Sequence, residues 1–412
     1  MNADSKRDGR YLVLTELFLP TKGGTAVWFA EVYRRLGGRG IHIVTAKVPG
    51  DETYDCSQPN TVHRLPLERV PWLKPESLGM YLRLLGRSLR ISLCHRFESI
   101  HAGRALPEGL VAWLVARLTR HRVLIYAHGE ELTTWGQGGK FKAMRFALRH
   151  ADTVVANSDF TRELLVAMGV RPERIRLIHP GVDTARFRPG LETADLRARL
   201  GLTAAQPLVL TIGRLQRRKG FDMVIRAVPG LVERGHDVHC ALVGIGEDGD
   251  YLRAIADELG VGDRVHLLGH VAPEDLPRWL VAADVFAMPN REIDGDNEGF
   301  GLVFLEAAAC GKPVVAGVDG GTGSAVVDGE TGFRVDGKRL EDVEAAIARL
   351  LDDPALARRL GEAARQRALG EFDWQAVAVR TRAAETLQAC ATAAAANESG
   401  RVEPRTIEQD GS

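Results

Sequence analysis

Short segments rich in β-branched residues alternate with helical stretches along almost the whole chain. In the first half, strands are predicted at 11–17, 41–46, 100–102, 123–127, 153–157 and 175–179, and helices at 25–36, 107–118, 141–149 and 159–168. This alternation is typical of parallel sheets with helices on both faces. It predicts an α/β fold, and no repeat of 20–50 residues indicates a solenoid.

A second series of strands begins after a break at PGVDTARFRPG, which holds two prolines and two glycines. Its strands are predicted at 208–212, 239–243, 265–268, 285–288, 313–316 and 332–335. A chain of 412 residues is long enough for two cores. We therefore expect one Rossmann-like domain at 1–190 and a second at 191–370. A helix at 371–396 is expected to return toward the first domain, followed by a disordered tail at 397–412.

Charge is unevenly distributed, although the formal net charge is zero. Residues 1–190 hold 29 Lys and Arg against 18 Asp and Glu, a balance of +11. Residues 191–412 hold the other 25 and 36, a balance of −11. A basic first half fits an anionic acceptor or a membrane surface, and charge drift in an arginine-rich protein fits it equally well.

The cysteines and the start of the chain bear on its location. The five cysteines are odd in number and none is spaced as C-x-x-C, so neither structural zinc nor a disulfide framework is expected. The start, MNADSKRDGRYLVLTELF, is polar and then strand-like, unlike a signal peptide. No apolar run reaches the roughly 18–20 residues that span a bilayer. We expect a cytoplasmic protein, with any membrane contact peripheral at the inner face.

The strongest chemical signal is a basic loop, GRLQRRKG at 213–220, between a predicted strand and a helix. Ligands of open α/β sheets bind at the carboxyl ends of strands. Gly213 lets the backbone approach a ligand closely. Arg214 and Lys219 could together neutralise a diphosphate, the first as a fork and the second as a point charge. A solvated basic turn is the alternative.

A second signal is NEGFGLVFLEA, where a flexible segment leads into a helix of small residues. Gly299 and Gly301 free backbone N–H groups at the helix N-terminus for hydroxyls or phosphate oxygens. Glu298 precedes the helix. Glu306 lies inside it among apolar neighbours, where a buried carboxylate needs a partner such as paired sugar hydroxyls. The alternatives are a capping role for Glu298 and a structural pair with an arginine for Glu306.

Together, the G-R-x5-G loop with its lysine, the E-x7-E element and PGVD-x3-F-x-P resemble the retaining GT-B glycosyltransferases of family 4 over nearly the whole chain. The resemblance implies two Rossmann-like domains facing a central cleft, with the acceptor on the first and the nucleotide-sugar donor on the second. It implies that Glu298 positions the donor sugar and stabilises charge, that Glu306 holds the nucleotide ribose, and that Arg214 and Lys219 bind the diphosphate. The donor site is expected to include Gly213, Gly299, Phe300 and Gly301.

Two further candidates lie in the first half. Gly23 and Gly24 resemble the family's glycine loop, whose backbone approaches the donor phosphate from the opposite domain, and a plain tight turn is the alternative. His128 ends the predicted strand 123–127, where a side chain faces a cleft. The resemblance implies that His128 hydrogen-bonds the transferred sugar, and that its backbone carbonyl stabilises the developing positive charge.

The sequence departs from the family at Ser324, where many members carry a glutamate in a GG-x-x-E pattern. The departure removes one expected phosphate-loop or donor-positioning contact without affecting the fold. Gly244 and Val271 are expected near the ribose or the base, with ordinary turns as the alternative.

The segment 77–97 is amphipathic and basic. Arg83, Arg87 and Arg90 stand at i, i+4 and i+7 among leucines and share one helix face. Such a face could rest on anionic lipid, or it could be the solvated side of a domain helix.

The expected reaction is transfer of a hexose from a nucleotide sugar, with retention, to a lipid-linked or saccharide acceptor in glycan or glycolipid biosynthesis. The surroundings of the motifs resemble most the branch that transfers mannose from GDP-mannose to phosphatidylinositol lipids. No Asp-x-Asp element demands a metal, and Asp294 and Asp296 look like loop solvation, so no metal or other cofactor is expected. Nucleic acid is not an expected partner. The alternatives are a nucleotide-sugar 2-epimerase and a non-catalytic sugar-nucleotide-binding subunit.

Overall fold

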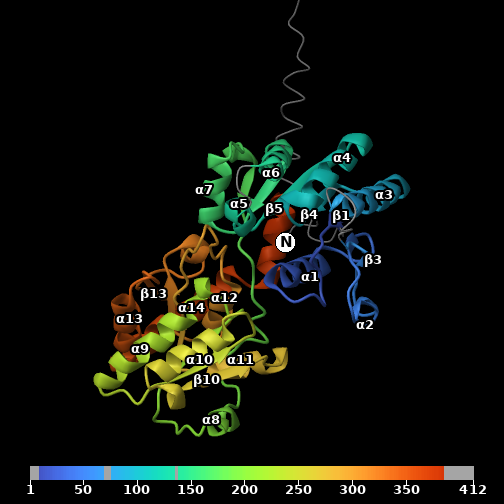
Figure 1. Cartoon of the computed structure of the whole chain (residues 1–412). Coiled ribbons are helices and arrows are strands. Elements are labelled where there is room, and N and C mark those ends of the chain that lie inside the picture. Colours follow the sequence, from blue (N-terminus) through green and yellow to red (C-terminus); the bar gives the residue numbers. More distant parts are fainter. Residues whose placement is uncertain (1–8, 69–75, 135–137, 385–412) are drawn as a thin grey trace, which may run out of the picture.

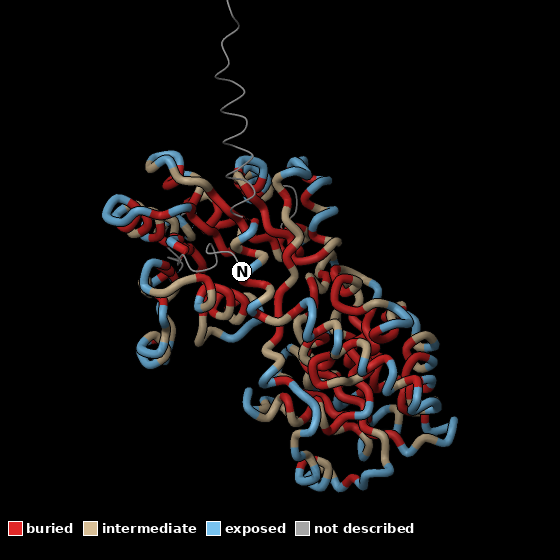
Figure 2. Tube along the Cα trace, turned by 180° about the vertical axis from the view of Figure 1, so that it is seen from behind, coloured by how far each residue is buried: buried red, intermediate tan, exposed pale blue. Residues whose placement is uncertain are grey.

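The computed structural model describes residues 9–68, 76–134 and 138–384, which form two lobes joined at a narrow waist (Figure 1). The upper lobe in that view carries α3, α4 and α6, and the lower lobe carries α9, α10 and α13. Each lobe is built on one parallel sheet. Buried residues concentrate inside the two lobes, and exposed segments run over their outer surfaces (Figure 2).

The N-terminal sheet has seven strands in the order β3-β2-β1-β4-β5-β6-β7. Their bounds are β1 (Tyr11–Leu14), β2 (His42–Ala46), β3 (Thr61–Leu65), β4 (Ser99–Ala102), β5 (Arg122–Ala127), β6 (Thr153–Ala156) and β7 (Ile175–Leu177). Alternate residues of β1 enter different cores. Leu12 and Leu14 pack on the side of α3 and α4, whereas Tyr11 and Val13 pack on the side of α1. Both faces of the sheet are therefore covered, as parallel sheets require.

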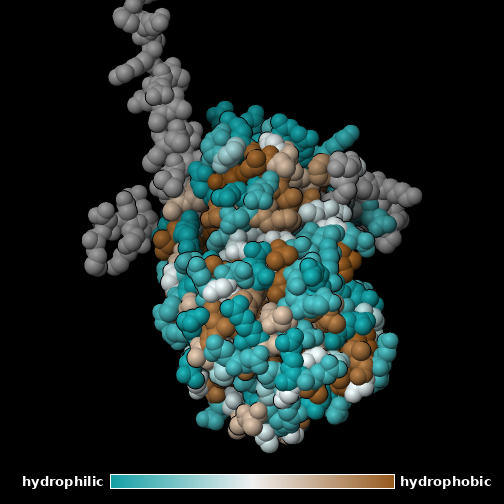
Figure 3. Space-filling model, turned by 90° about the vertical axis from the view of Figure 1, so that its left-hand side faces the viewer, coloured by the Kyte–Doolittle hydropathy of each residue, from teal (hydrophilic) through white to brown (hydrophobic). Residues whose placement is uncertain are grey.

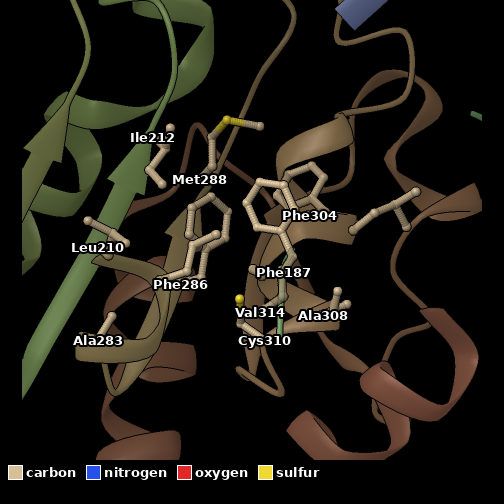
Figure 4. Close-up of a cluster of buried hydrophobic side chains, with 14 of the residues drawn as sticks. Phe187, Leu210, Ile212, Ala283, Phe286, Met288, Phe304, Ala308, Cys310 and Val314 are labelled. Carbon is tan, nitrogen blue, oxygen red and sulfur yellow. The ribbon is translucent and has the colours of Figure 1, made fainter. Parts of the chain in front are cut away.

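The C-terminal sheet has six strands in the order β10-β9-β8-β11-β12-β13. Their bounds are β8 (Leu208–Ile212), β9 (His239–Val243), β10 (Val265–Gly269), β11 (Val285–Met288), β12 (Val314–Gly317) and β13 (Gly332–Val335). One of its two cores packs Phe286 and Met288 against Phe304 and Phe187 (Figure 4). The other core lies on the opposite face and includes Val209, the neighbour of Leu210 in β8.

Helices connect the strands on both faces. In the N-terminal lobe they are α1 (Gly24–Leu36), α2 (Asp51–Asp55), α3 (Leu78–Cys94), α4 (Leu110–Thr119), α5 (Glu130–Thr134), α6 (Gly139–His150) and α7 (Asp159–Ala167). In the C-terminal lobe they are α8 (Ala194–Arg199), α9 (Phe221–Glu233), α10 (Gly249–Glu258), α11 (Leu276–Ala282), α12 (Leu302–Ala309), α13 (Leu340–Asp352) and α14 (Pro354–Glu371). The predicted α/β fold with two Rossmann-like sheets is confirmed.

The C-terminal end of the described chain returns to the first lobe. Val182 donates a 2.7 Å backbone hydrogen bond to Phe372 and forms an isolated bridge with Asp373. Residues 374–384 are helical, and this segment lies beside α1 (Figure 1, red). Trp374 and Val377 are buried in the core that contains α1. The predicted return of this helix is confirmed. Residues 385–396 of the predicted helix and the predicted tail at 397–412 lie outside the described residues.

The structure differs from the predicted elements in four places. The sequence pattern misses β3, an edge strand whose residues are all half-buried, because its alternation of buried and exposed positions is weak. The strand predicted at 11–17 ends at Leu14. The helix predicted at 107–118 begins at Leu110, because a π-helical turn, η2 (Ala105–Gly109), precedes it. The helix predicted from 371 is interrupted at 372–373, where the chain bridges to Val182.

Each sheet has one point where the strand order reverses. In the N-terminal sheet it lies between β1 and β4, and in the C-terminal sheet between β8 and β11. At such a switch point the connections leave on opposite faces, so a crevice forms outside the carboxyl ends of the strands. The fold therefore offers two crevices.

Candidate active site

A cavity of about 300 Å³ lies between the lobes at the carboxyl ends of their strands. The N-terminal lobe lines it from the start of α1 and the end of β5, and the C-terminal lobe from the end of β8 and the segment before α12. Eight of the thirteen predicted site residues line it: Gly24, His128, Gly213, Lys219, Glu298, Gly299, Phe300 and Gly301. The central cleft expected from the sequence is therefore present.

Another cavity, of about 380 Å³, lies at the amino ends of the C-terminal strands, beside Asp284, Lys312 and Pro313. None of the predicted site residues lines it. Ligands of parallel sheets bind at the carboxyl ends of strands, so the interlobe cavity is the candidate active site despite its smaller volume.

A cluster of two cations and two carboxylates lies where the C-terminal lobe borders the interlobe cavity. Lys219 Nζ and Arg218 Nη1 both contact Glu298 Oε2, the arginine at 3.2 Å. Arg218 Nε lies 2.8 Å from Asp296 Oδ2. Burial raises the pKa of the Glu298 carboxyl, but the charges of Lys219 and Arg218 outweigh burial and hold this pKa below its usual value. Glu298 is therefore charged at neutral pH.

Glycines shape the loops that carry this cluster. Gly220 has a φ of 75°, and a Cβ there would lie 2.2 Å from the Pro289 carbonyl oxygen, so only glycine fits directly after Lys219. A Cβ on Gly244 would lie 1.8 Å from the Gly213 carbonyl oxygen. The loops that follow β8 and β9 are thus in backbone contact. This contact explains why residue 244 is a glycine, although Gly244 does not line the cavity.

The segment before α12 brings the two lobes together. A Cβ on Gly299 would lie 2.1 Å from the His128 carbonyl oxygen. A Cβ on Gly24 would lie 2.4 Å from the Leu302 side chain in the first turn of α12. Gly299 is therefore required where the backbones of the two lobes approach each other, whereas the close neighbour of Gly24 is the end of the Leu302 side chain. The N-terminus of α12, where Leu302 and Val303 line the cavity, adds the positive end of the helix dipole.

His128 faces the cavity from the end of β5. Its Nε2 lies 2.8 Å from the Gly103 carbonyl oxygen, and its own carbonyl oxygen accepts a 2.8 Å hydrogen bond from Asn157 Nδ2. Burial lowers the pKa of the imidazole, an effect that the charge of Glu131 opposes. A neutral ring that donates through Nε2 to Gly103 leaves Nδ1 as a hydrogen-bond acceptor.

Glu306 lies in α12, outside the residues that line the cavity. Burial raises the pKa of this carboxyl to about 7, and only the charge of Arg186 opposes it. Within residues 9–68, 76–134 and 138–384, its carboxylate forms no ion pair and accepts no hydrogen bond. The sequence left open the alternative that Glu306 forms a structural ion pair with an arginine. Among the described residues, Glu306 forms no such pair.

Other predicted residues stand at the periphery. Arg214 follows Gly213 in the basic loop, and its side chain is exposed outside the cavity lining. Gly23 has a φ of 138°, with open space where a Cβ would stand. Val271 is half-buried and packs against the C-terminal core instead of lining the cavity.

Sequence reasoning missed several residues of the site. Trp28 and Asn157 line the cavity from the N-terminal lobe. Arg218 contacts Glu298, although only its neighbours in the basic loop were singled out. The interpretation of Asp296 as loop solvation is wrong, because its carboxylate pairs with Arg218. The sequence does show three cations at 217–219 and two acids at 296 and 298. Their pairing depends on the fold, which brings the two loops together.

Ser324 links the two lobes. In the turn η7 (Gly320–Ser324), its Oγ accepts a 3.0 Å hydrogen bond from the Asp159 backbone N–H and lies 3.1 Å from Asp159 Oδ2. Asp159 is the first residue of α7, on the other lobe. A glutamate at position 324 would face the Asp159 carboxylate and be repelled by it. A serine at this position therefore suits an aspartate at position 159.

The predicted amphipathic segment forms α3, but two of its arginines have intramolecular partners. Arg83 donates to the Pro66 carbonyl oxygen at 2.7 Å, and Arg87 lies 2.9 Å from His63. Leu82 and Leu93 of the same helix are exposed. Among the described residues, no helix has both the length and the apolar character to cross a bilayer. On the face shown in Figure 3, hydrophobic residues form separate patches among hydrophilic ones.

Comparison with known proteins identifies the family of the chain. The family profile described as "Glycosyltransferase Family 4" matches residues 22–186, and "Glycosyl transferases group 1" matches residues 192–367. A GDP-mannose-dependent alpha-(1-6)-phosphatidylinositol monomannoside mannosyltransferase of Mycolicibacterium smegmatis is 34% identical over 387 residues, which cover 92% of this chain and 97% of the relative. A D-inositol 3-phosphate glycosyltransferase of Acidothermus cellulolyticus is 41% identical over 212 residues, 49% of this chain and 46% of the relative.

Solved structures share the fold. Anabaena Alr3699/HepE in complex with UDP superimposes with a TM-score of 0.78 at 23% identity, covering 92% of this chain and all of the other. Sucrose-phosphate synthase from Thermosynechococcus elongatus gives a TM-score of 0.72 at 25% identity, with 93% and 100% coverage. Two Rossmann-like lobes around a cleft with paired charges define a GT-B glycosyltransferase. The chain belongs to glycosyltransferase family 4.

Proposed function

We propose that this glycosyltransferase transfers mannose from GDP-mannose, with retention, to a phosphatidylinositol-type lipid acceptor. The relative from Mycolicibacterium smegmatis, which is named for this donor and this lipid class, aligns along 92% of the chain. The observation that carries the proposal is the contact of Lys219 and Arg218 with Glu298 at the edge of the interlobe cavity.

In the proposed donor complex, the diphosphate binds the cations of the basic loop. Lys219 and Arg214 contact its oxygens, and the exposed Arg214 side chain can turn toward them. Glu298 then holds a sugar hydroxyl, and Glu306 accepts hydrogen bonds from the ribose. Since the leaving diphosphate gains negative charge, Lys219 and Arg214 stabilise the transition state more than the ground state.

His128 acts on the sugar from the other lobe. Its Nδ1 accepts a hydrogen bond from a sugar hydroxyl, and its carbonyl oxygen, held by Asn157 at 2.8 Å, stabilises the positive charge that develops near the anomeric carbon. The acceptor hydroxyl gives its proton to the leaving phosphate oxygen as the new bond forms. Mannose is α-linked in GDP-mannose, so an α-linked product corresponds to retention.

The chain's own cations are proposed to do the work that a divalent metal performs in other transferases. Activity is therefore expected to persist in EDTA. The exposed leucines and basic residues of α3 are proposed to bring the enzyme to anionic lipid, at the inner face of the membrane.

A donor panel tests this function. GDP-mannose, UDP-glucose and a UDP-linked aminosugar are compared for thermal stabilisation, and then for transfer to phosphatidylinositol in vesicles. The expected result is stabilisation by GDP-mannose and formation of an α-mannosylated lipid. No stabilisation by any nucleotide sugar would contradict the proposal. Exchange of the sugar C2 hydrogen with solvent, without transfer, would favour an epimerase.

A further inference from the structure

His179 lies where the chain passes from the N-terminal lobe to the C-terminal lobe. It comes two residues after β7 and directly before Pro180, which lines the interlobe cavity. The His179 side chain is half-buried, and it is not among the described residues that line the cavity. The proposed donor chemistry does not use this histidine, so its contacts must show what it does at the border of the site.

One contact of His179 reaches the N-terminal lobe. Its Nδ1 lies 2.9 Å from the Asn157 carbonyl oxygen. Since a carbonyl oxygen only accepts, the ring carries a proton on Nδ1 and donates it here. Burial lowers the pKa of the imidazole, which favours a neutral ring with this single N–H. The backbone of Asn157 is thereby tied to the crossover between the lobes.

Asn157 passes this restraint on to His128. The Asn157 side chain donates a 2.8 Å hydrogen bond to the His128 carbonyl oxygen, and both residues line the cavity. Asn157 Oδ1 accepts a 2.6 Å hydrogen bond from Thr161 Oγ1, so the orientation of the amide is fixed. The His128 carbonyl is therefore held in place by a residue that His179 holds in turn.

Another contact of His179 reaches the C-terminal lobe. Its ring centroid lies 5.5 Å from that of Phe300 and 5.8 Å from that of Phe372, and the two phenylalanine rings lie 6.1 Å apart. Tilted ring pairs at such distances attract each other. Phe300 is 4% exposed and lines the cavity between Glu298 and α12. Packing against His179 therefore keeps this wall of the cavity in place.

The two contacts converge on the His128 carbonyl. A Cβ on Gly299, the neighbour of Phe300, would lie 2.1 Å from this oxygen and 3.3 Å from Asn157 Nδ2. We propose that His179 is a positioning residue, which acts through Asn157 on the site carbonyl and through Phe300 on the wall of the cavity, without touching the substrate. The inference rests on the proposed function, which assigns charge stabilisation to this carbonyl and places the donor in this cavity.

Two substitutions separate the two contacts. His179→Phe keeps a ring against Phe300 and removes the hydrogen bond to Asn157. His179→Asn keeps a side-chain N–H for Asn157 and removes the ring. Because the carbonyl stabilises charge that develops only in the transition state, His179→Phe should lower kcat about tenfold and leave the donor KM unchanged. His179→Asn should raise the donor KM several-fold with kcat retained, because the wall against the bound donor loses its support.

Steady-state transfer from GDP-mannose measures both parameters, with kcat referred to the concentration of GDP-binding sites found by calorimetry. A merely structural role would lower the melting temperature and the number of such sites, and would leave kcat per site and KM as in the wild type. His121 provides matched controls, because it is half-buried, lies 2.7 Å from Thr119 Oγ1 and packs near Phe97. It precedes β5, at the strand end away from the cavity. His121→Phe and His121→Asn should keep wild-type kinetics.

Wild-type kcat per site and KM in both His179 variants, or the same change in both, would overturn the inference. Calorimetry with GDP and with UDP gives a second measurement that needs no transfer. His179→Asn should weaken nucleotide binding several-fold, and His179→Phe should not; equal affinities in the wild type and His179→Asn would count against the contact through Phe300. A wild type that binds nucleotide without transferring the sugar contradicts the proposed function, while the affinities still decide the role of His179.

Discussion

The two switch points of this enzyme have the same topology but differ in how their charged residues are paired. At the C-terminal one, between β8 and β11, Lys219, Arg218 and Glu298 are paired with one another at the cavity edge. At the N-terminal one, between β1 and β4, Arg104 has no ion pair within the described residues, and Glu108 Oε2 lacks a hydrogen-bond partner. The charged groups at the C-terminal switch point therefore pair with one another, whereas Arg104 at the N-terminal switch point forms no ion pair within the described residues.

This difference separates two ways of preparing a binding site. Cations held by an acidic neighbour are fixed before the ligand arrives, so little reorganisation is needed when charge develops on the leaving group. Unpaired polar groups instead gain most from the ligand that completes them. Under the proposed function, the paired cluster at the C-terminal switch point is prepared for charge stabilisation, and the following changes test that cluster and its surroundings.

Breaking the paired cluster should have the largest effect. Glu298→Gln and Lys219→Ala are each expected to lower kcat about 10²–10³-fold, because each removes a charge that contacts the reacting part of the donor. Steady-state kinetics with a fixed acceptor measure this. Arg217→Ala is the control, since Arg217 belongs to the same loop but pairs with Asp248. Full activity in both variants would refute the assignment of this cluster.

The pH dependence of stability should report Glu306. Its folded-state pKa of about 7 lies above the unfolded value, so its stabilising contribution is fully present below about pH 4.5 and is lost as pH rises through 7. Between pH 5 and 8 the wild type should lose up to about 3 kcal/mol more unfolding free energy than Glu306→Gln. Urea titrations at several pH values measure the difference. If the unfolding free energies of the wild type and Glu306→Gln change with pH in parallel, burial does not raise the pKa of the Glu306 carboxyl.

Arg218→Gln should have a smaller effect and shift the pH profile. Arg218 helps Lys219 to hold the pKa of Glu298 below its usual value, so losing it raises that pKa. Under the proposed mechanism, activity needs the Glu298 carboxylate and is lost as pH falls through this pKa. The acid limb of kcat should therefore move to higher pH, and the loss of activity at neutral pH should be smaller than that of Lys219→Ala. An unchanged acid limb would show that a group other than Glu298 limits kcat at low pH.

The contact between the lobes should matter least. Ser324→Ala removes the hydrogen bond from the Asp159 N–H, worth about 1 kcal/mol, and should raise the donor KM several-fold without changing kcat. Ser324→Glu should raise it further, because a second carboxylate would face Asp159. Gly323→Ala is no suitable control, since a Cβ there would lie 2.9 Å from Arg334 Nη1. Glu330→Gln, on an exposed turn, is preferable.

The sequence predicted the fold more completely than the site. Buried parallel strands are continuous apolar runs, so all six C-terminal strands were found, whereas the half-buried edge strand β3 was missed. Motif residues such as Lys219, Glu298 and His128 were found because their spacing follows strand and helix ends. Trp28 and Asn157 have no such spacing, and their place in the cavity depends on how the lobes meet. The pairing of Arg218 with Asp296 joins residues 78 positions apart, which no local pattern reveals.

Nucleotide binding to the paired cluster tests the central claim most directly. The affinities of GDP and of guanosine are measured by calorimetry for the wild type and for Lys219→Ala, with Arg217→Ala alongside. If the C-terminal switch point binds the donor diphosphate, Lys219→Ala weakens GDP binding at least tenfold and leaves guanosine binding unchanged. Equal GDP affinities in the wild type and Lys219→Ala would contradict the account.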